Sequence, residues 1–93
     1  MSDDRIERMK NRLHQALHPM ALEIIDESHK HAGHAGAQGG KGHYKMKIVS
    51  KQFEGELPVA RHRLIYAALG DMMDNEIHAL NIKALTPDET QPV

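Results

Sequence analysis

Apolar residues recur at every third or fourth position along the start of the chain. This spacing predicts an amphipathic helix over residues 3–17. Its apolar stripe would be formed by Ile6, Met9, Leu13, Ala16 and Leu17. Ser2 or Asp3 can cap the start of this helix, and Pro19 prevents it from continuing. His14 and His18 lie one turn apart near its end, where solvated histidines that complement the helix dipole are favoured over a metal site.

Two strands and a long connection follow. Residues 21–27 read as a strand that turns acidic at its far end. Apolar and polar residues alternate over residues 43–49, which predicts a second strand. Tyr44, Met46 and Ile48 would face inward and the lysines outward. Residues 28–42 contain five glycines in fifteen positions and predict a flexible loop. The two strands should therefore form a hairpin with a long tip.

The second half predicts a helix and a last strand. Pro58 suits the first turn of a helix over residues 58–74. Phe53 should anchor the connection that precedes this helix. That connection has room for one extra helical turn. Asp74-Asn75-Glu76 would supply the turn into a third strand over residues 77–85. The inner face of the helix would be formed by Leu64, Ile65, Ala68, Leu69 and Met72, with Arg63, Asp71 and Asp74 pointing away. One face of the third strand would carry His78, Leu80, Ile82 and Ala84.

These elements give the order α-β-β-α-β. The fold class is therefore α+β, with a three-stranded sheet that carries its helices on one face. We expect one domain over residues 1–88, including the loop at 29–42, and a disordered tail over residues 89–93.

Composition narrows the classes of function. The formal net charge is -1, from 12 Lys and Arg against 13 Asp and Glu, which counts against binding nucleic acid by bulk electrostatics alone. The chain has no Cys, and therefore no thiolate nucleophile and no cluster site made by this chain alone. We expect no enzymatic activity, because no catalytic constellation stands out. The acidic start and the lack of a long apolar run predict a cytoplasmic protein without a membrane partner.

Histidine is the unusual residue, with eight copies in 93 residues. His29, His31 and His34 cluster in the predicted loop, and neutral imidazole is a good ligand for Zn, Cu, Ni or Fe. A loop alone does not fix the geometry of these three ligands. Composition by itself therefore favours a His-rich loop without a specific role. The weaker alternative is a loop that binds zinc or nickel without a partner. The residue pattern alone predicts that His62 and His78 are ordinary structural histidines.

Several segments together resemble the BolA family. The resemblance runs in order through nearly all of residues 5–88. It is carried by Leu22-Glu23-Ile24-Ile25-Asp26-Glu27-Ser28, His43-Tyr44-Lys45, Ile48-Val49-Ser50, Phe53-Glu54-Gly55, Arg61-His62-Arg63-Leu64-Ile65-Tyr66, Ala67-Ala68-Leu69 and Ile77-His78-Ala79-Leu80. The resemblance implies a fold like the class II KH domain and a partnership with monothiol glutaredoxins.

In that family the heterodimer holds a 2Fe-2S cluster, to which the glutaredoxin cysteine and glutathione supply sulfur ligands. The resemblance implies that the BolA-like chain supplies His78 and a second ligand from the hairpin loop. His31 is the best match for that second ligand, because it follows Glu27-Ser28 at the family's offset. The loop here is longer than the family pattern requires, so His34 and His29 stay open as alternatives. No cluster is expected to be bound tightly by the isolated chain.

Bacterial members of the family have also been linked to transcriptional control. Gly33-His34-Ala35-Gly36 matches the KH Gly-x-x-Gly pattern, but it lies between two predicted strands rather than two helices, so we treat it as coincidental. The alternative function is therefore a DNA-binding transcriptional regulator that uses the KH-like helical surface. Its DNA contacts would more plausibly use Arg61, Arg63 and nearby lysines, which could also form the surface that docks a glutaredoxin. His62 is assigned a structural or docking role.

Overall fold

The computed structural model describes residues 2–28 and 41–90 of the chain. Its elements are α1 (Ser2–Leu17), β1 (Ala21–Asp26), β2 (Gly42–Val49), the 3-10 turn η3 (Lys51–Phe53), α2 (Pro58–Leu69), α3 (Met72–Asn75), β3 (Ile77–Leu85) and the 3-10 turn η4 (Asp88–Thr90). The predicted α-β-β-α-β order and the extra turn before α2 are confirmed. In the parts described, no helix is both long and apolar enough to cross a bilayer.

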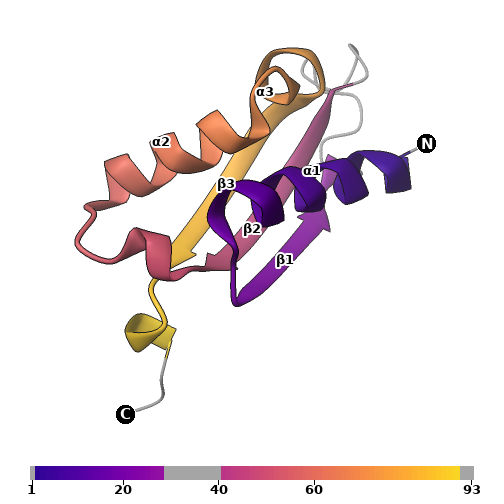
Figure 1. The fold of residues 1–93 in the computed structure, drawn as a ribbon. Helices are drawn as coiled ribbons and strands as arrows, with labels where there is room; N and C mark the ends of the chain where they lie inside the picture. The colour runs from indigo at the N-terminus through magenta and orange to yellow at the C-terminus, as the bar shows by residue number, and fades with distance from the viewer. Residues whose placement is uncertain (1, 29–40, 91–93) are drawn as a thin grey trace.

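The three strands form one sheet in the order β1-β2-β3. The central strand β2 runs antiparallel to β1 and parallel to β3. Figure 1 shows α1 and α2 lying across the same face of this sheet, so the molecule has two layers. The predicted α+β class, with helices on one face, is confirmed.

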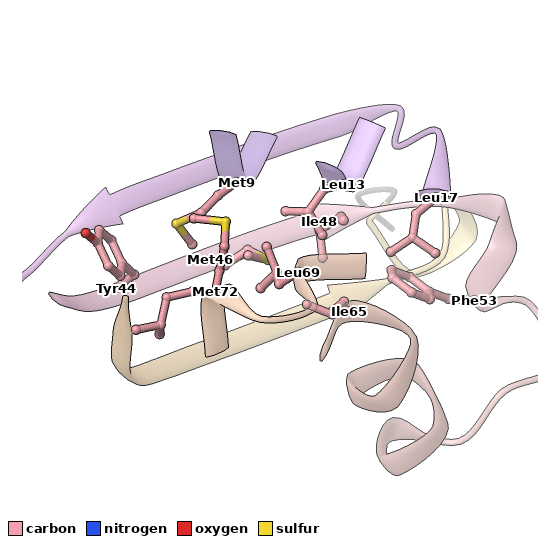
Figure 2. Packing of buried hydrophobic residues seen from close by; sticks show 11 residues of the cluster. Met9, Leu13, Leu17, Tyr44, Met46, Ile48, Phe53, Ile65, Leu69 and Met72 are labelled. Carbon is pink, nitrogen blue, oxygen red and sulfur yellow. The ribbon is translucent and has the colours of Figure 1, made fainter. Parts of the chain in front are cut away.

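The core lies between the sheet and the two long helices. On β2, Tyr44, Met46 and Ile48 are buried while Lys45 and Lys47 are exposed, as the alternation predicted. Side chains from α1 and α2 meet those of β2 in Figure 2. The members of this cluster are Met9, Leu13, Leu17, Tyr44, Met46, Ile48, Phe53, Ile65, Leu69, Met72 and Ile77. The inward position predicted for Ala16 is wrong, because that side chain is exposed one position before the end of α1.

The helix predicted over residues 58–74 is interrupted. α2 ends at Leu69, and Gly70 has φ +58, a left-handed value that most residues adopt only with strain. Ile65, Leu69 and Met72 are buried as predicted, but Leu64 is 37% exposed and its predicted inward position is wrong. Leu64 precedes the buried Ile65 by one position, which turns it about 100° away around the helix.

The corner between α2 and α3 is held by α1. Arg12 donates from Nη1 to the carbonyl oxygen of Leu69 at 2.6 Å and to Oδ1 of Asp71 at 2.9 Å. The Leu69 carbonyl is one of the groups that a helix end leaves without an intrahelical partner. The hydrogen bond from Arg12 chiefly lowers the pKa of Asp71 below its ordinary value. Asp71 does point to solvent as predicted, and it also binds α1.

The turn between β2 and α2 is buried at its centre. Phe53 is fully buried, as its predicted anchoring role requires. Ser50, also fully buried, donates from its hydroxyl to the carbonyl oxygen of Leu17 at 2.7 Å. The same hydroxyl oxygen accepts from the backbone N–H of Gln52 at 3.1 Å. Ser50 thus joins the end of α1 to the start of η3.

The chain after β3 is ordered further than predicted. Asp88–Thr90 form the turn η4, so the tail predicted to be disordered from residue 89 is wrong for residues 89 and 90, and residues 91–93 lie outside the description. Arg61 holds this turn by donating from Nη1 and Nη2 to the Glu89 carboxylate at 2.6 and 3.1 Å. Hydrogen bonds from Arg61 and from the backbone of Thr86 lower the pKa of Glu89 to about 2.

Replacing Ser50 by Ala should destabilise the fold. The Leu17 carbonyl would lose its buried donor, and such a loss costs about 1–3 kcal/mol in the free energy of unfolding. Urea unfolding of Ser50→Ala measures this. Thr90→Ala is the matched control, because it removes an exposed hydroxyl that donates to the Pro87 carbonyl; its effect should stay within about 0.5 kcal/mol. Equal effects of the two substitutions would contradict the role given to Ser50.

The pairing of Glu89 with Arg61 should make stability depend on acid pH. The folded-state pKa of about 2 lies below the ordinary 4.5, so the stabilisation is fully present above pH 4.5 and is lost as the pH falls toward 2. Glu89→Gln lacks this contribution. Denaturant midpoints measured from neutral pH down to about pH 3 should therefore show a gap between wild type and Glu89→Gln that narrows in acid. Asp88→Asn in the same turn is the control, and a gap independent of pH would contradict the prediction.

Candidate metal centre at the start of β3

The pairing of β3 with β2 is irregular at its first residues. Gly42 lies opposite Ile77 and His43 lies opposite Ala79, so His78 is an extra residue without a partner in β2. Such a bulge bends the strand and re-aims a side chain. Ile77 is buried and His78 is exposed. The candidate ligand His78 therefore stands out from the end of the sheet.

This bulge corrects one prediction. Leu80, Ile82 and Ala84 pack against the core, as the alternation required. His78 was predicted on the same face, but the extra residue lets Ile77 take the inward position instead. The sequence carried a sign of this, because the apolar Ile77 is out of phase with the apolar positions that follow it.

A second imidazole lies beside His78. The ring centroids of His43 and His78 are 5.0 Å apart, and the two ring planes are tilted by 52°. His43 is 8% exposed. Sequence reasoning placed His43 only at the start of a strand, because these two residues are 35 positions apart and nothing in their spacing indicates that they meet.

The backbone of His43 is fixed by its neighbours. Its N–H donates to the hydroxyl oxygen of Ser28 at 3.0 Å, and its carbonyl accepts from the N–H of Glu27 at 2.8 Å. One residue earlier, the N–H of Gly42 donates to the carbonyl oxygen of Glu76 at 2.9 Å. The starts of β2 and β3 and the end of β1 are therefore joined around this histidine.

Glu76, two residues before His78, is held by α1. Arg8 donates to both of its carboxylate oxygens, at 2.6 and 2.5 Å, and Arg5 lies at 3.5 Å as an ion pair. The hydrogen bonds from Arg8 are the main cause of a pKa of Glu76 below its ordinary value. The side chain and the backbone of Glu76 thus both fix the chain that leads into the bulge.

Gly42 is needed at the start of β2 for a steric reason. A Cβ on this residue would lie 2.5–2.6 Å from atoms of the Tyr44 ring, closer than real contacts allow. The Tyr44 hydroxyl in turn accepts from Arg5 at 3.3 Å. Sequence reasoning counted Gly42 as one glycine of the loop, whereas it is a strand residue over which a core tyrosine lies.

The predicted loop ligands His29, His31 and His34 lie outside the described residues. The described ends of that segment are Ser28 and Lys41. Among residues 2–28 and 41–90, no group of three or more His, Cys, Asp or Glu side chains is arranged to hold a metal ion. What the described chain brings together is one pair of imidazoles.

An open groove of about 610 Å³ passes beside His43. His43 lines it from β2 and Glu27 lines it from the end of β1, while His62 and Tyr66 line it from α2. The rings of His62 and Tyr66 meet edge to face with centroids 6.4 Å apart. This position of His62 is compatible with both of its predicted roles, structural and docking.

The two arginines of the predicted partner or nucleic-acid surface differ. The side chain of Arg61 is only 11% exposed. Besides Glu89 it binds the carbonyl oxygens of Glu56 at 2.8 Å and Ala84 at 3.0 Å. Arg63 is exposed. A partner would therefore meet the guanidinium of Arg63 more readily than that of Arg61.

Comparisons with known proteins agree with this architecture. A sequence model for the family described as BolA-like protein matches residues 13–89. The chloroplast protein BOLA1 of Arabidopsis thaliana is 45% identical over 91 residues, which cover 95% of this chain and 57% of that protein. The DNA-binding transcriptional regulator BolA of Escherichia coli is 37% identical over 83 residues, which cover 89% of this chain and 76% of that protein.

The fold is shared as well. The solved BolA domain of SufE1 from Arabidopsis thaliana superposes with a TM-score of 0.82 at 43% identity, covering 92% of this chain and 95% of that domain. The chain thus spans little more than half the length of BOLA1 but nearly the whole of a solved BolA domain. On the family match, the identities and the shared fold, this chain belongs to the BolA family.

Proposed function

We propose that this chain is a non-catalytic partner of a monothiol glutaredoxin and supplies imidazole ligands to a shared 2Fe-2S cluster, for cluster trafficking or for iron or redox sensing. The observation that carries the proposal is the exposed His78 on its bulge, beside a second imidazole, in a BolA chain without cysteine. A ligand in this position is accessible to another protein, and a cysteine-free chain depends on such a protein for thiolate ligands.

The donor set fits one half of a cluster site. Imidazole nitrogen binds iron, and in Rieske centres two histidines replace two thiolates on one iron. Neutral ligands in place of thiolates raise the reduction potential of the cluster and couple it to protonation of the histidines. The remaining ligands would come from the glutaredoxin cysteine and from glutathione.

The second ligand is proposed to be His31. Ser28, the last described residue before it, is bound to the backbone of His43, which lies beside His78. Three residues of chain span at most about 11 Å, so the length of chain after Ser28 permits His31 to contribute a ligand to this site. His29 and His34 are the alternatives on the same segment.

The location of the protein is part of the proposal. The cytoplasmic location expected from the sequence stays a prediction, and the Arabidopsis relative BOLA1 is named a chloroplast protein. A monothiol glutaredoxin in the same compartment is the partner that the proposal requires.

Co-expression with a monothiol glutaredoxin should give a coloured heterodimer whose visible spectrum differs from that of the glutaredoxin homodimer. The double variant His31→Ala, His78→Ala should lose the bands specific to the heterodimer, because both proposed nitrogen ligands are gone. The matched control is His14→Ala, His18→Ala, which removes two exposed histidines at the end of α1 and after it. A heterodimer spectrum left unaltered by the first double variant would show that the ligands are wrong, and absence of any coloured complex would contradict the proposed function.

A second candidate function is DNA binding, because the Escherichia coli relative is named a DNA-binding transcriptional regulator. The sheet face opposite the helices carries exposed Lys45, Lys47 and Lys83, and the last two lie directly opposite each other in the strand pairing. These lysines and Arg63 offer positive charge to a nucleic acid. Arg61 differs from them, because its guanidinium already binds Glu89 in η4.

This alternative predicts binding that weakens steeply with salt. In gel-shift titrations, Arg63→Ala and Lys45→Ala should each weaken binding to all sequences alike and lower the log–log salt slope by about 0.9 per lost phosphate contact. Arg61→Ala is a poor test, because it also releases Glu89. Lys10→Ala on α1 serves as the control. No shift at low salt would exclude the alternative.

A further inference from the structure

We propose that His43 and His78 together form a binding site for a borderline divalent metal ion, such as Zn²⁺, in this chain alone. The site shares His78 with the proposed function, but it needs neither a partner nor a histidine from residues 29–40. Its second ligand, His43, comes from the sheet.

The separation of the two rings suits one shared ion. A histidine nitrogen binds zinc at about 2.0–2.1 Å, which puts the ring centroid roughly 3.2 Å from the metal. Two such rings at a near-tetrahedral angle therefore have centroids about 5 Å apart. The rings of His43 and His78 are 5.0 Å apart and tilted by 52°.

The two ligands are brought together by backbone structure. The bulge in β3 gives His78 its position. The hydrogen bond from the N–H of Gly42 to the carbonyl oxygen of Glu76 joins the two strands just before His43 and His78. The backbone of His43 is held by Ser28 and by Glu27. Because both ligands are on paired strands, little backbone conformational entropy remains to be lost when they bind an ion.

The pair is open to solvent on the side of His78, and its coordination is incomplete. His78 is exposed, whereas His43 is 8% exposed and lines the open groove together with Glu27. Two nitrogen ligands leave two positions of a tetrahedral ion for water or for a ligand from another molecule. Imidazole suits Zn, Cu and Ni, so the site should select such ions over Mg²⁺ or Ca²⁺, which prefer oxygen.

The test is a Zn²⁺ titration of the full chain carrying His29→Ala, His31→Ala and His34→Ala, followed through the imidazole resonances of ¹⁵N-labelled histidine. The site predicts that His43 and His78 shift together with one dissociation constant, while Mg²⁺ shifts neither. His78→Gln, a change at an exposed position, should weaken binding at least tenfold. His14→Gln, the control on α1, should leave the dissociation constant unchanged.

Three results would overturn the site. These are a His43 resonance that does not respond to Zn²⁺, an affinity unchanged in His78→Gln, and no binding once the three loop histidines are replaced. The readout involves Zn²⁺ and the isolated chain only. A failure here therefore leaves the glutaredoxin complex and its visible spectrum as a separate question.

Discussion

β3 pairs in parallel with the central strand β2, and one extra residue at its start determines both part of the core and the candidate metal centre. Because the side chains of a strand alternate, a shift of one residue turns every following side chain to the opposite face. With His78 left out of the pairing, Ile77 is buried and Leu80 and Ile82 still face the helices. The same irregularity exposes His78 and brings its ring beside that of His43.

Several neighbouring elements fix the first residues of β2 and β3. Glu76 binds Gly42 through its backbone and Arg8 through its carboxylate, so α1 is connected to the first residues of both strands. Exposed ion pairs contribute little to stability on average. The effect we assign to Arg8 and Arg12 is therefore positional. Arg12 fixes the corner between α2 and α3 relative to α1, and Arg8 fixes Glu76, two residues before His78. The paired strands position the imidazole pair, and the longer segment between β1 and β2 carries the additional histidines.

Local pattern was enough to predict most of the fold. The alternation around Tyr44, Met46 and Ile48 and the helical spacing in α1 gave the inward faces, since each depends on residues close in sequence. The failures have long-range or single-residue causes. Gly70 interrupts a helical pattern that otherwise continues to Met72, and Glu89 is ordered by an arginine 28 positions earlier.

The candidate site was predictable only in part. His78 was identified by the family pattern, but its exposure depends on a bulge that is defined by pairing with another strand. His43 could not be recognised as its neighbour, because only the register of β2 and β3 brings the two rings together. The contribution of His31 rests on the family resemblance and on its tether at Ser28, and it stays a prediction.

We propose that His78 is a metal ligand whose site is completed by another protein. Pulsed EPR of the reduced heterodimer with a monothiol glutaredoxin, with ¹⁵N-histidine incorporated only into this chain, tests it most directly. We expect strong nitrogen couplings that change with the isotope and that lose one component in His78→Ala. The absence of isotope-sensitive nitrogen coupling, or couplings that persist unchanged in His78→Ala, would contradict it.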